Sequence, residues 1–307
     1  ECVAEVEDGE TLIFRTHDCF DDQLSEEGST IGSLNWDCIN PATGPVYIKN
    51  ALPGDVLKVE ILEIALGKQG VMCALPDNGV LGSLVKEESV KRLKVENGKV
   101  HFNEKIVFDI SPMIGVIGVA PENGSVNCGT PGNHGGNMDN KRITEGVTLY
   151  FPVFHKGAIF SLGDVHAAMG DGEVMVSGVE IAADVKVRLS VIKGTSIETP
   201  MLENEDSCGV IYSHEDIEKA VFHAVRIMNE IMQKKLGLSL NDAGMLISAV
   251  GDLKFCQVVD PGYDVCTQIN SCSFVLANKF TESRFKKRIC LIKFLVISTI
   301  KLYSKNN

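Results

Sequence analysis

Short apolar runs separated by turn-forming residues fill the first two-thirds of the chain and limit what it can fold into. The runs are rich in Val, Ile, Leu and Phe, and Gly, Pro, Asn or Asp interrupts them at brief intervals, which favours strands joined by tight turns. In DVLKVEILEIAL (55–66) the apolar residues follow an imperfect two-residue period, which indicates a strand with at least one buried face. Together the runs predict a mainly β fold, a β-sandwich or barrel-like set of sheets. The predicted strands are TLIFRT, PVYIKN, DVLKVEILEIAL, GVMCAL, PMIGVIGVA, TLYFPVFH, AIFSLGDVHAAM, EVMVSGVEI and DVKVRLSVI.

A segment near residues 214–250 departs from this pattern and predicts an inserted helical hairpin, because its apolar residues recur at helical spacing. Ser213 with Asp216 fits a variant capping box, and Gly237 fits the end of the first helix. A second, shorter helix is expected to end at Gly251. The residues predicted to face inward are Ile217, Ala220, Val221, Ala224, Ile227, Met228, Ile231 and Met232 in the first helix, then Ala243, Leu246, Ile247 and Val250 in the second.

The length of 307 residues allows one large domain or two modest ones. We predict a single β-rich domain over residues 1–261, followed by an atypical C-terminal tail over residues 262–307. Residues 284–305 of that tail are basic against an acidic body, and their apolar stretch is too short to span a bilayer as a helix. A basic surface helix, a terminal strand and a frameshifted sequence all explain this composition.

Charge and cysteine usage narrow the function classes. The formal net charge of −12 argues against a nucleic-acid partner, because phosphate binding needs clustered Lys and Arg. No membrane segment or signal peptide is visible, and the start of the chain suggests that a short leading segment is missing. Ten cysteines are scattered without a CxxC pair, which predicts reduced thiols in a cytoplasmic protein. These features suit a protein that acts on a small neutral molecule.

Four polar islands place Asp, His, Asn and Glu among glycines, at residues 16–23, 40–46, 130–140 and 163–173. In the last island Asp164 and His166 end a predicted strand. Residues two apart on a strand face the same side, so this carboxylate and imidazole would project together and could bind zinc or a similar ion. Glu173 follows a turn that could serve catalysis or only close a hairpin, and an acid there could act as general base.

The other islands leave two interpretations open. The glycines around His134 would let the backbone approach a ligand or offer N–H groups to an oxyanion, or they could form a simple exposed turn. In residues 16–23, Asp18 could ligate an ion, and Cys19 could be a nucleophile or a small buried residue. Nucleophile signatures such as GxSxG are missing, which favours metal-activated water.

At these islands the chain resembles the acetamidase/formamidase family, from about Gly9 to Pro261. The strings that carry the resemblance include THDCFDDQ, NPATGPVYI, SPMIGVIGVAP, CGTPGNHGGNMD, FSLGDVHAAMGDGEV with the GVEI that follows it, and CQVVDP. The resemblance implies a β-rich fold and hydrolysis of short-chain amides such as formamide or acetamide to a carboxylate and ammonia. It also implies a divalent metal, zinc with calcium as an additional candidate, and a homodimer or larger homo-oligomer. Beyond Pro261 the sequence departs from the family's usual final strand.

Carried over by motif, the resemblance implies a site assembled from three separate loops, in which Glu173 is the general base for a metal-activated water. The candidate metal ligands are Asp18, His134, His166 and Asp164. The candidate catalytic residues are Glu173, Asn137 and Asp139, and the candidates for holding the substrate are Gly135 and Gly136. Two alternatives stay open: an amidase with Cys19 as nucleophile, and a non-catalytic β-sandwich module that binds a small ligand.

Overall fold

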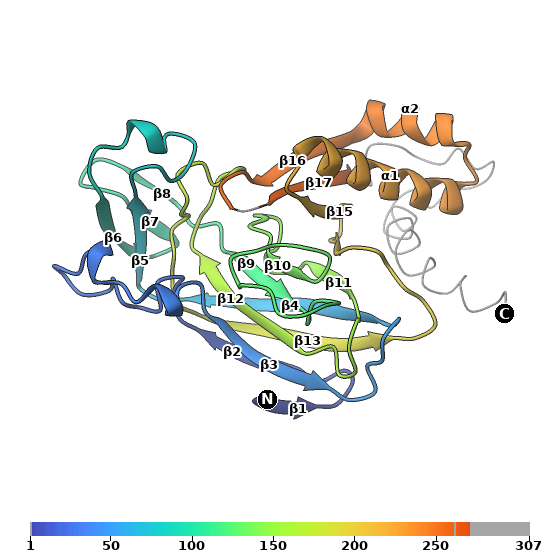
Figure 1. Cartoon of the computed structure of the whole chain (residues 1–307), viewed down its shortest axis with the longest axis horizontal. Coiled ribbons are helices and arrows are strands. Elements are labelled where there is room, and N and C mark those ends of the chain that lie inside the picture. The colour runs from blue at the N-terminus through green and yellow to red at the C-terminus, as the bar shows by residue number, and fades with distance from the viewer. Residues whose placement is uncertain (1, 261, 271–307) are drawn as a thin grey trace.

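The computed structural model describes residues 2–260 and 262–270, whose strands form three sheets (Figure 1). The five-stranded sheet has the order β1 (Ala4–Val6), β3 (Ala42–Ile48), β12 (Phe160–His166), β9 (Met113–Gly118) and β10 (Gly135–Asn137). The eight-stranded sheet has the order β16 (Gly251–Gln257), β17 (Tyr263–Asn270), β15 (Ser207–His214), β14 (Met201–Glu203), β11 (Thr148–Pro152), β4 (Val56–Leu66), β13 (Ala183–Ile192) and β2 (Thr11–Thr16). The four-stranded sheet contains β5 (Gln69–Ala74), β6 (Ser89–Glu96), β7 (Lys99–His101) and β8 (Val107–Asp109).

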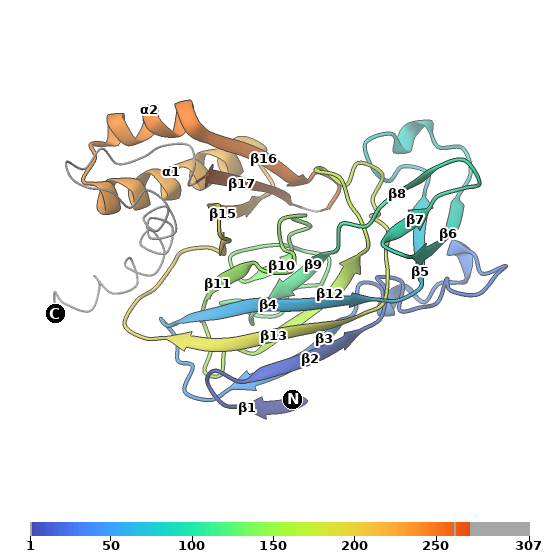
Figure 2. The same ribbon diagram turned by 180° about the vertical axis from the view of Figure 1, so that it is seen from behind.

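The main core lies between the five-stranded sheet and the part of the eight-stranded sheet that contains β2, β13, β4 and β11. Figure 2 shows β2, β13 and β4 side by side on the back of the molecule, where β13 pairs with each of the other two in antiparallel direction. Phe14 of β2 meets Phe160 of β12 edge to face, with ring centroids 5.6 Å apart, and Phe151 of β11 lies 6.5 Å from Phe160. Such aromatic contacts add to the apolar area that the two sheets bury. The mainly β fold predicted from the sequence is confirmed.

A bulge explains why the alternation in β4 is imperfect. Leu57, Val59 and Ile61 are buried in turn, but the next buried residue is Ile64. The pairing of β4 with β13 shifts register there, so that Leu62 is the extra residue. The insertion reverses which side chains face the core, because every residue added to a strand moves its successors to the other face.

The predicted helical hairpin is confirmed as α1 (Ile217–Leu236) and α2 (Leu240–Val250), inserted between β15 and β16. The hairpin lies at the end of the molecule opposite the four-stranded sheet (Figure 1), and α1 packs on β15 and β17. Gly237 ends α1 in the left-handed conformation, with φ of 66°, as glycine readily does. The buried residues of the hairpin are Ala220, Ala224, Ile227, Met228, Ile231, Met232, Ala243 and Ile247. Within the described residues, no helix is both long and apolar enough to cross a bilayer.

Two local predictions were wrong. Ser213 does not cap α1, because it lies in β15 and its hydroxyl donates to Asp264; the Asp216 carboxylate caps the helix instead, accepting from the N–H groups of Glu218 and Lys219. Residues 173–181, the run EVMVSGVEI, form a loop rather than a strand. Positive φ values at Glu173 and Val176, 45° and 72°, interrupt any extended course.

The chain continues as β17 after residue 262, between β16 and β15 in the sheet. The domain boundary predicted at residue 261 stays a prediction. The basic segment 284–305 lies outside the described residues.

Replacing Phe160 with alanine should lower the free energy of unfolding by about 3–5 kcal/mol, because the ring is fully buried between the sheets. Urea denaturation of wild type and variant measures the loss. Phe222→Ala is the control, since this ring on α1 is 62% exposed and its removal should change stability by less than about 0.5 kcal/mol. A loss at Phe160 as small as that at Phe222 would contradict a core centred there.

Candidate functional site

Strand β12 ends with two side chains that meet. The Nε2 atom of His166 lies 3.3 Å from Oδ1 of Asp164, so the prediction that the two side chains project together is confirmed. The backbone is not that of a regular strand, since Asp164 has a φ of 53°. Its carboxylate lies over Gly115 of the neighbouring strand β9, where a Cβ atom would stand 2.4 Å from Asp164 Oδ2. A glycine at this position therefore makes room for the carboxylate.

Three further carboxylates approach the same imidazole. Glu180 Oε2 lies 3.0 Å from His166 Nε2, and Asp139 Oδ1 lies 3.8 Å from it. One ligand atom each of Asp139, His166 and Glu173 lie within 4.8 Å of one another. Asp139 follows β10, whereas Glu173 and Glu180 lie in the loop that follows β12. Different segments of the chain thus bring four carboxylates to one imidazole. We call the five residues the His166 cluster: Asp139, Asp164, His166, Glu173 and Glu180.

Burial dominates the electrostatics of the His166 cluster. It raises the pKa of Asp139 and Glu173 well above the usual range, and neighbouring carboxylates add to the rise. Burial likewise raises the pKa of Glu180 to about 7. For His166 burial lowers the pKa, but the carboxylates of Glu180 and Asp164 outweigh it and raise the pKa well above its ordinary value. The cluster therefore concentrates negative charge that only a cation or protons can offset.

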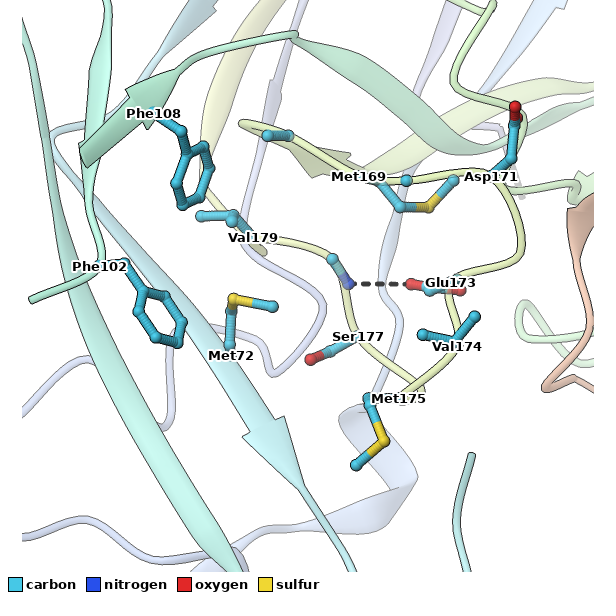
Figure 3. A pocket seen from close by; sticks show the side chains of 13 residues that line it. Met72, Phe102, Phe108, Met169, Asp171, Glu173, Val174, Met175, Ser177 and Val179 are labelled. Atoms are coloured by element: carbon cyan, nitrogen blue, oxygen red, sulfur yellow. Dashed lines mark hydrogen bonds between the residues drawn. The ribbon is translucent and has the colours of Figure 1, made fainter. Parts of the chain in front are cut away.

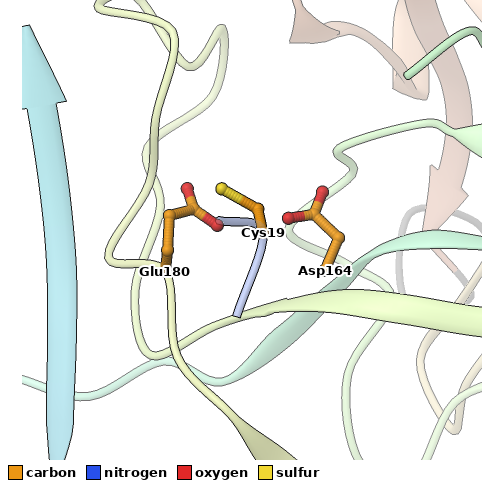
Figure 4. Close-up of side chains that lie close together, drawn as sticks. All are labelled: Cys19, Asp164 and Glu180. Carbon is orange, nitrogen blue, oxygen red and sulfur yellow. The ribbon is translucent and has the colours of Figure 1, made fainter. Parts of the chain in front are cut away.

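A second group overlaps the first. Cys19 Sγ and carboxylate oxygens of Asp164 and Glu180 lie within 4.8 Å of one another (Figure 4). Burial raises the pKa of the Cys19 thiol well above its usual value, and the two carboxylates raise it further. A nucleophilic cysteine needs a lowered pKa, because the thiolate is the reactive form. The surroundings of Cys19 therefore disfavour it as the nucleophile of an amidase.

Asp18 and His134 lie outside both groups. The Asp18 carboxylate accepts hydrogen bonds from the N–H groups of Phe20 and Asp22, which turns it into its own loop. The imidazole of His134 lies over Gly136, where a Cβ atom would stand 2.9 Å from Nε2. Burial lowers the pKa of His134, which keeps the ring neutral. The side chains that lie near His166, besides Asp164, are those of Asp139, Glu173 and Glu180. That Asp18 and His134 help to bind an ion stays a prediction.

The glycine-rich loop is closed by its own backbone. The N–H of Gly135 donates to the carbonyl of Gly132, and the reverse bond is also present. Gly135 would have to leave this bond before its N–H could hold a substrate oxygen. Asn137 Nδ2 donates to Asp260 Oδ2 over 2.6 Å, whereas Asn137 Oδ1 is buried and has no hydrogen-bond partner within the described chain.

Two members of the site were missed as individual residues, although both lie in strings that carry the family resemblance. Glu180 follows the motif of β12 at GVEI, and Asp260 precedes Pro261 in CQVVDP. Burial raises the pKa of Asp260 to about 6. Glu180 lies in the run 173–181, which was expected to be a strand, and Asp260 lies far along the chain from the polar islands, so neither was singled out.

The donors of the His166 cluster suit a divalent ion. No N–H group of a described residue donates to either oxygen of Asp139, although the side chain is 1% exposed; only a proton shared with the Asp260 carboxyl group would bond to it. Buried polar atoms without partners are rare, and an ion is one of the things that can satisfy them. Carboxylate oxygens with an imidazole are ligands that zinc and similar ions accept. The residues present therefore fit a divalent metal.

An apolar pocket of about 480 Å³ adjoins the cluster (Figure 3). The four-stranded sheet contributes Met72 and Phe108 to its lining, and the loop after β12 contributes Met169 and Met175. Glu173 also lines it, and its carboxylate accepts a hydrogen bond from the N–H of Gly178 over 3.0 Å. Glu173 thus belongs to both the pocket and the charged cluster.

Comparison with known proteins decides the family. The model of the Acetamidase/Formamidase family matches residues 1–127 and 124–260. The chain belongs to this family. Every residue of the His166 cluster lies within the matched range, so the buried carboxylates are part of the family domain.

Solved structures of the family share the fold. A predicted acetamidase/formamidase of Thermoanaerobacter tengcongensis is 43% identical, with a TM-score of 0.86, and the match covers 89% of this chain and 90% of that one. The acetamidase of Bacillus halodurans is 40% identical, with a TM-score of 0.85, and the match covers 88% of this chain and 92% of that one.

Curated relatives match over shorter stretches. The formamidase of Methylophilus methylotrophus is 42% identical over 64 residues, which are 20% of this chain and 16% of that protein. The matches span 16% to 61% of the length of the curated relatives.

Gly115→Ala should weaken the binding of a divalent metal ion at the His166 cluster at least about tenfold, because the added Cβ would stand 2.4 Å from oxygens of both Asp139 and Asp164. Competition with a chromophoric chelator measures the affinity. Gly32→Ala is the matched control, since its Cβ would meet only the Thr30 hydroxyl at 3.8 Å. An unchanged affinity in a folded Gly115→Ala protein would place the ion elsewhere.

Proposed function

We propose that this chain hydrolyses the C–N bond of short-chain amides such as formamide and acetamide to a carboxylate and ammonia. The observation that carries the proposal is the buried His166 cluster, with its unsatisfied carboxylate oxygens, in a member of this family. Asp139, Asp164 and His166 are the proposed ion ligands. Glu180, 3.0 Å from the imidazole, would hold the ring in place.

The proposed reaction adds water to the amide carbon. A divalent ion, when bound, polarises the carbonyl and lowers the pKa of the attacking water. Glu173 takes a proton from that water as its oxygen bonds to the carbon. It then returns the proton to the nitrogen as the C–N bond breaks. Asn137 and the amides of Gly135 and Gly136 are the proposed donors to the developing oxyanion.

We propose zinc as the ion, since imidazole and carboxylate ligands suit it, with calcium as an additional candidate. We further propose a homodimer or larger homo-oligomer in the cytoplasm. All eight described cysteines are free, as expected in a reducing compartment. The helical hairpin exposes Phe222, Leu240 and Met245, each more than half accessible, and such apolar side chains suit a contact between copies.

Removal of metal should abolish ammonia release, and added zinc should restore it. Protein dialysed against EDTA and then against metal-free buffer is assayed with formamide and acetamide. The same protein reloaded with zinc provides the comparison. Full activity without metal would remove the ion from the mechanism, and absence of ammonia from any short amide in the zinc-loaded protein would favour a non-catalytic binding module.

Glu173→Gln should lower kcat about 10²–10⁴-fold, the range expected for loss of a general base. Bound zinc, measured on the same samples, should remain, which separates a base from an ion ligand. Glu205→Gln, in an exposed turn, is the matched control and should keep full activity. Mass spectrometry during turnover should find no acyl group on Cys19, and such an adduct would revive the cysteine mechanism.

A further inference from the structure

The pocket beside Glu173 is larger than a formamide or acetamide molecule needs. Its volume of about 480 Å³ falls in the range of about 300–1,000 Å³ that is typical of pockets for larger organic ligands. The carbon substituent of acetamide is a single methyl group. A site for acetamide alone would leave most of this space to water.

The pocket reaches the His166 cluster through two residues. Glu173 lines it and also lies with Asp139 and His166. Gly178 lines it as well, and a Cβ atom on this glycine would stand only 2.6 Å from His166 Nδ1. The wall between the pocket and the imidazole is therefore one glycine thick. Glu173 is the side chain common to both spaces, so an amide group held beside its carboxylate would have its substituent next to the pocket.

The lining is apolar and adaptable. Figure 3 shows Met72, Met169 and Met175 around the cavity with Phe102 and Phe108. Methionine side chains are flexible and polarisable, so they adjust to apolar groups of different shape. The rim is apolar too: Val174 is 51% exposed, and its carbonyl accepts from the N–H of Val80, itself 59% exposed.

The polar side chains of the lining, apart from Glu173, already have partners. Ser177 Oγ accepts from the N–H of Cys73 over 3.1 Å and donates to the carbonyl of the same residue. Asp171 forms a two-pronged ion pair with Arg142, with both distances 3.0 Å. Neither group is free to bind a polar substituent, so the pocket selects for an apolar one.

We propose that the amides cleaved here include ones with an extended apolar acyl chain, which lies in the methionine- and phenylalanine-lined pocket while the amide group lies at the His166 cluster. This inference rests on the proposed amide hydrolysis. It makes Met72, Phe102 and Met175 residues that determine specificity. The preferred substrate class is then a primary amide with an acyl chain longer than that of acetamide.

The test is kcat/KM of the zinc-loaded full chain for acetamide, butyramide and hexanamide. We expect a rise of about fourfold for each added methylene group that the pocket buries. Ala168→Phe, which fills the pocket from its wall, should lower the hexanamide-to-acetamide ratio at least tenfold. Val174→Asp, a change at an exposed position of the rim, should lower the same ratio and guards against misfolding of the first variant. Ala65→Phe, on an exposed part of β4, is the matched control and should leave both activities unchanged.

The outcomes separate this inference from the proposed function. Hydrolysis of acetamide with a ratio that is flat along the series, or unaffected by Ala168→Phe and Val174→Asp, overturns the inference and leaves amide hydrolysis standing. Failure of every amide to release ammonia overturns the proposed function. In that case calorimetric titration with hexanamide decides about the pocket: binding that Ala168→Phe abolishes supports it, and no binding to the wild type refutes it.

Discussion

The burial of four carboxylates around the His166 imidazole is the constraint on which this structure depends. Removing charge from water is costly, and each of these groups raises the cost for its neighbours. The fold holds them together through one strand end and the loops beside it. Asp164 and His166 end a central strand of the five-stranded sheet, and Gly115 on the adjacent strand leaves the space that their approach requires. The negative charge of such a cluster has to be offset by a cation or by protons, and its desolvation lowers the stability of the fold.

The surroundings divide the labour of the site. The carboxylates and the imidazole meet at the end of β12, in the five-stranded sheet. The methionine and phenylalanine side chains line the neighbouring pocket, next to the four-stranded sheet. Glu173 belongs to both groups: it lies on the loop after β12, its carboxylate is near Asp139 and His166, and it also lines the pocket. The hairpin of β16 and β17 closes the site through the bond from Asn137 to Asp260. Chemistry and recognition of an apolar chain can thus occupy adjoining spaces.

Much of the fold followed from periodicity, because apolar residues must face a core wherever they lie. The strands β2, β4 and β13 and both helices were predicted in place, and Gly237 marked the end of α1. The errors arose where a tertiary contact overrode a local pattern. Ser213 bonds to Asp264 of a strand fifty-one residues on rather than to its own helix, and residues 173–181 look like a strand by composition but bend to place Glu173.

For the site, the sequence by itself determined which residue types are present. It determined that Asp164 and His166 share a strand end, and it marked Asp139 and Glu173 in neighbouring polar islands. It determined the family through motifs of unusual composition. Only the tertiary structure decided that Glu180, Cys19 and Asp260 join them. It also decided that the carboxylate of Asp18 and the ring of His134 turn toward their own loops. The physical reason is that periodicity reports which face a residue takes, whereas the meeting of distant loops depends on sheet register and bulges, which many weak contacts set together.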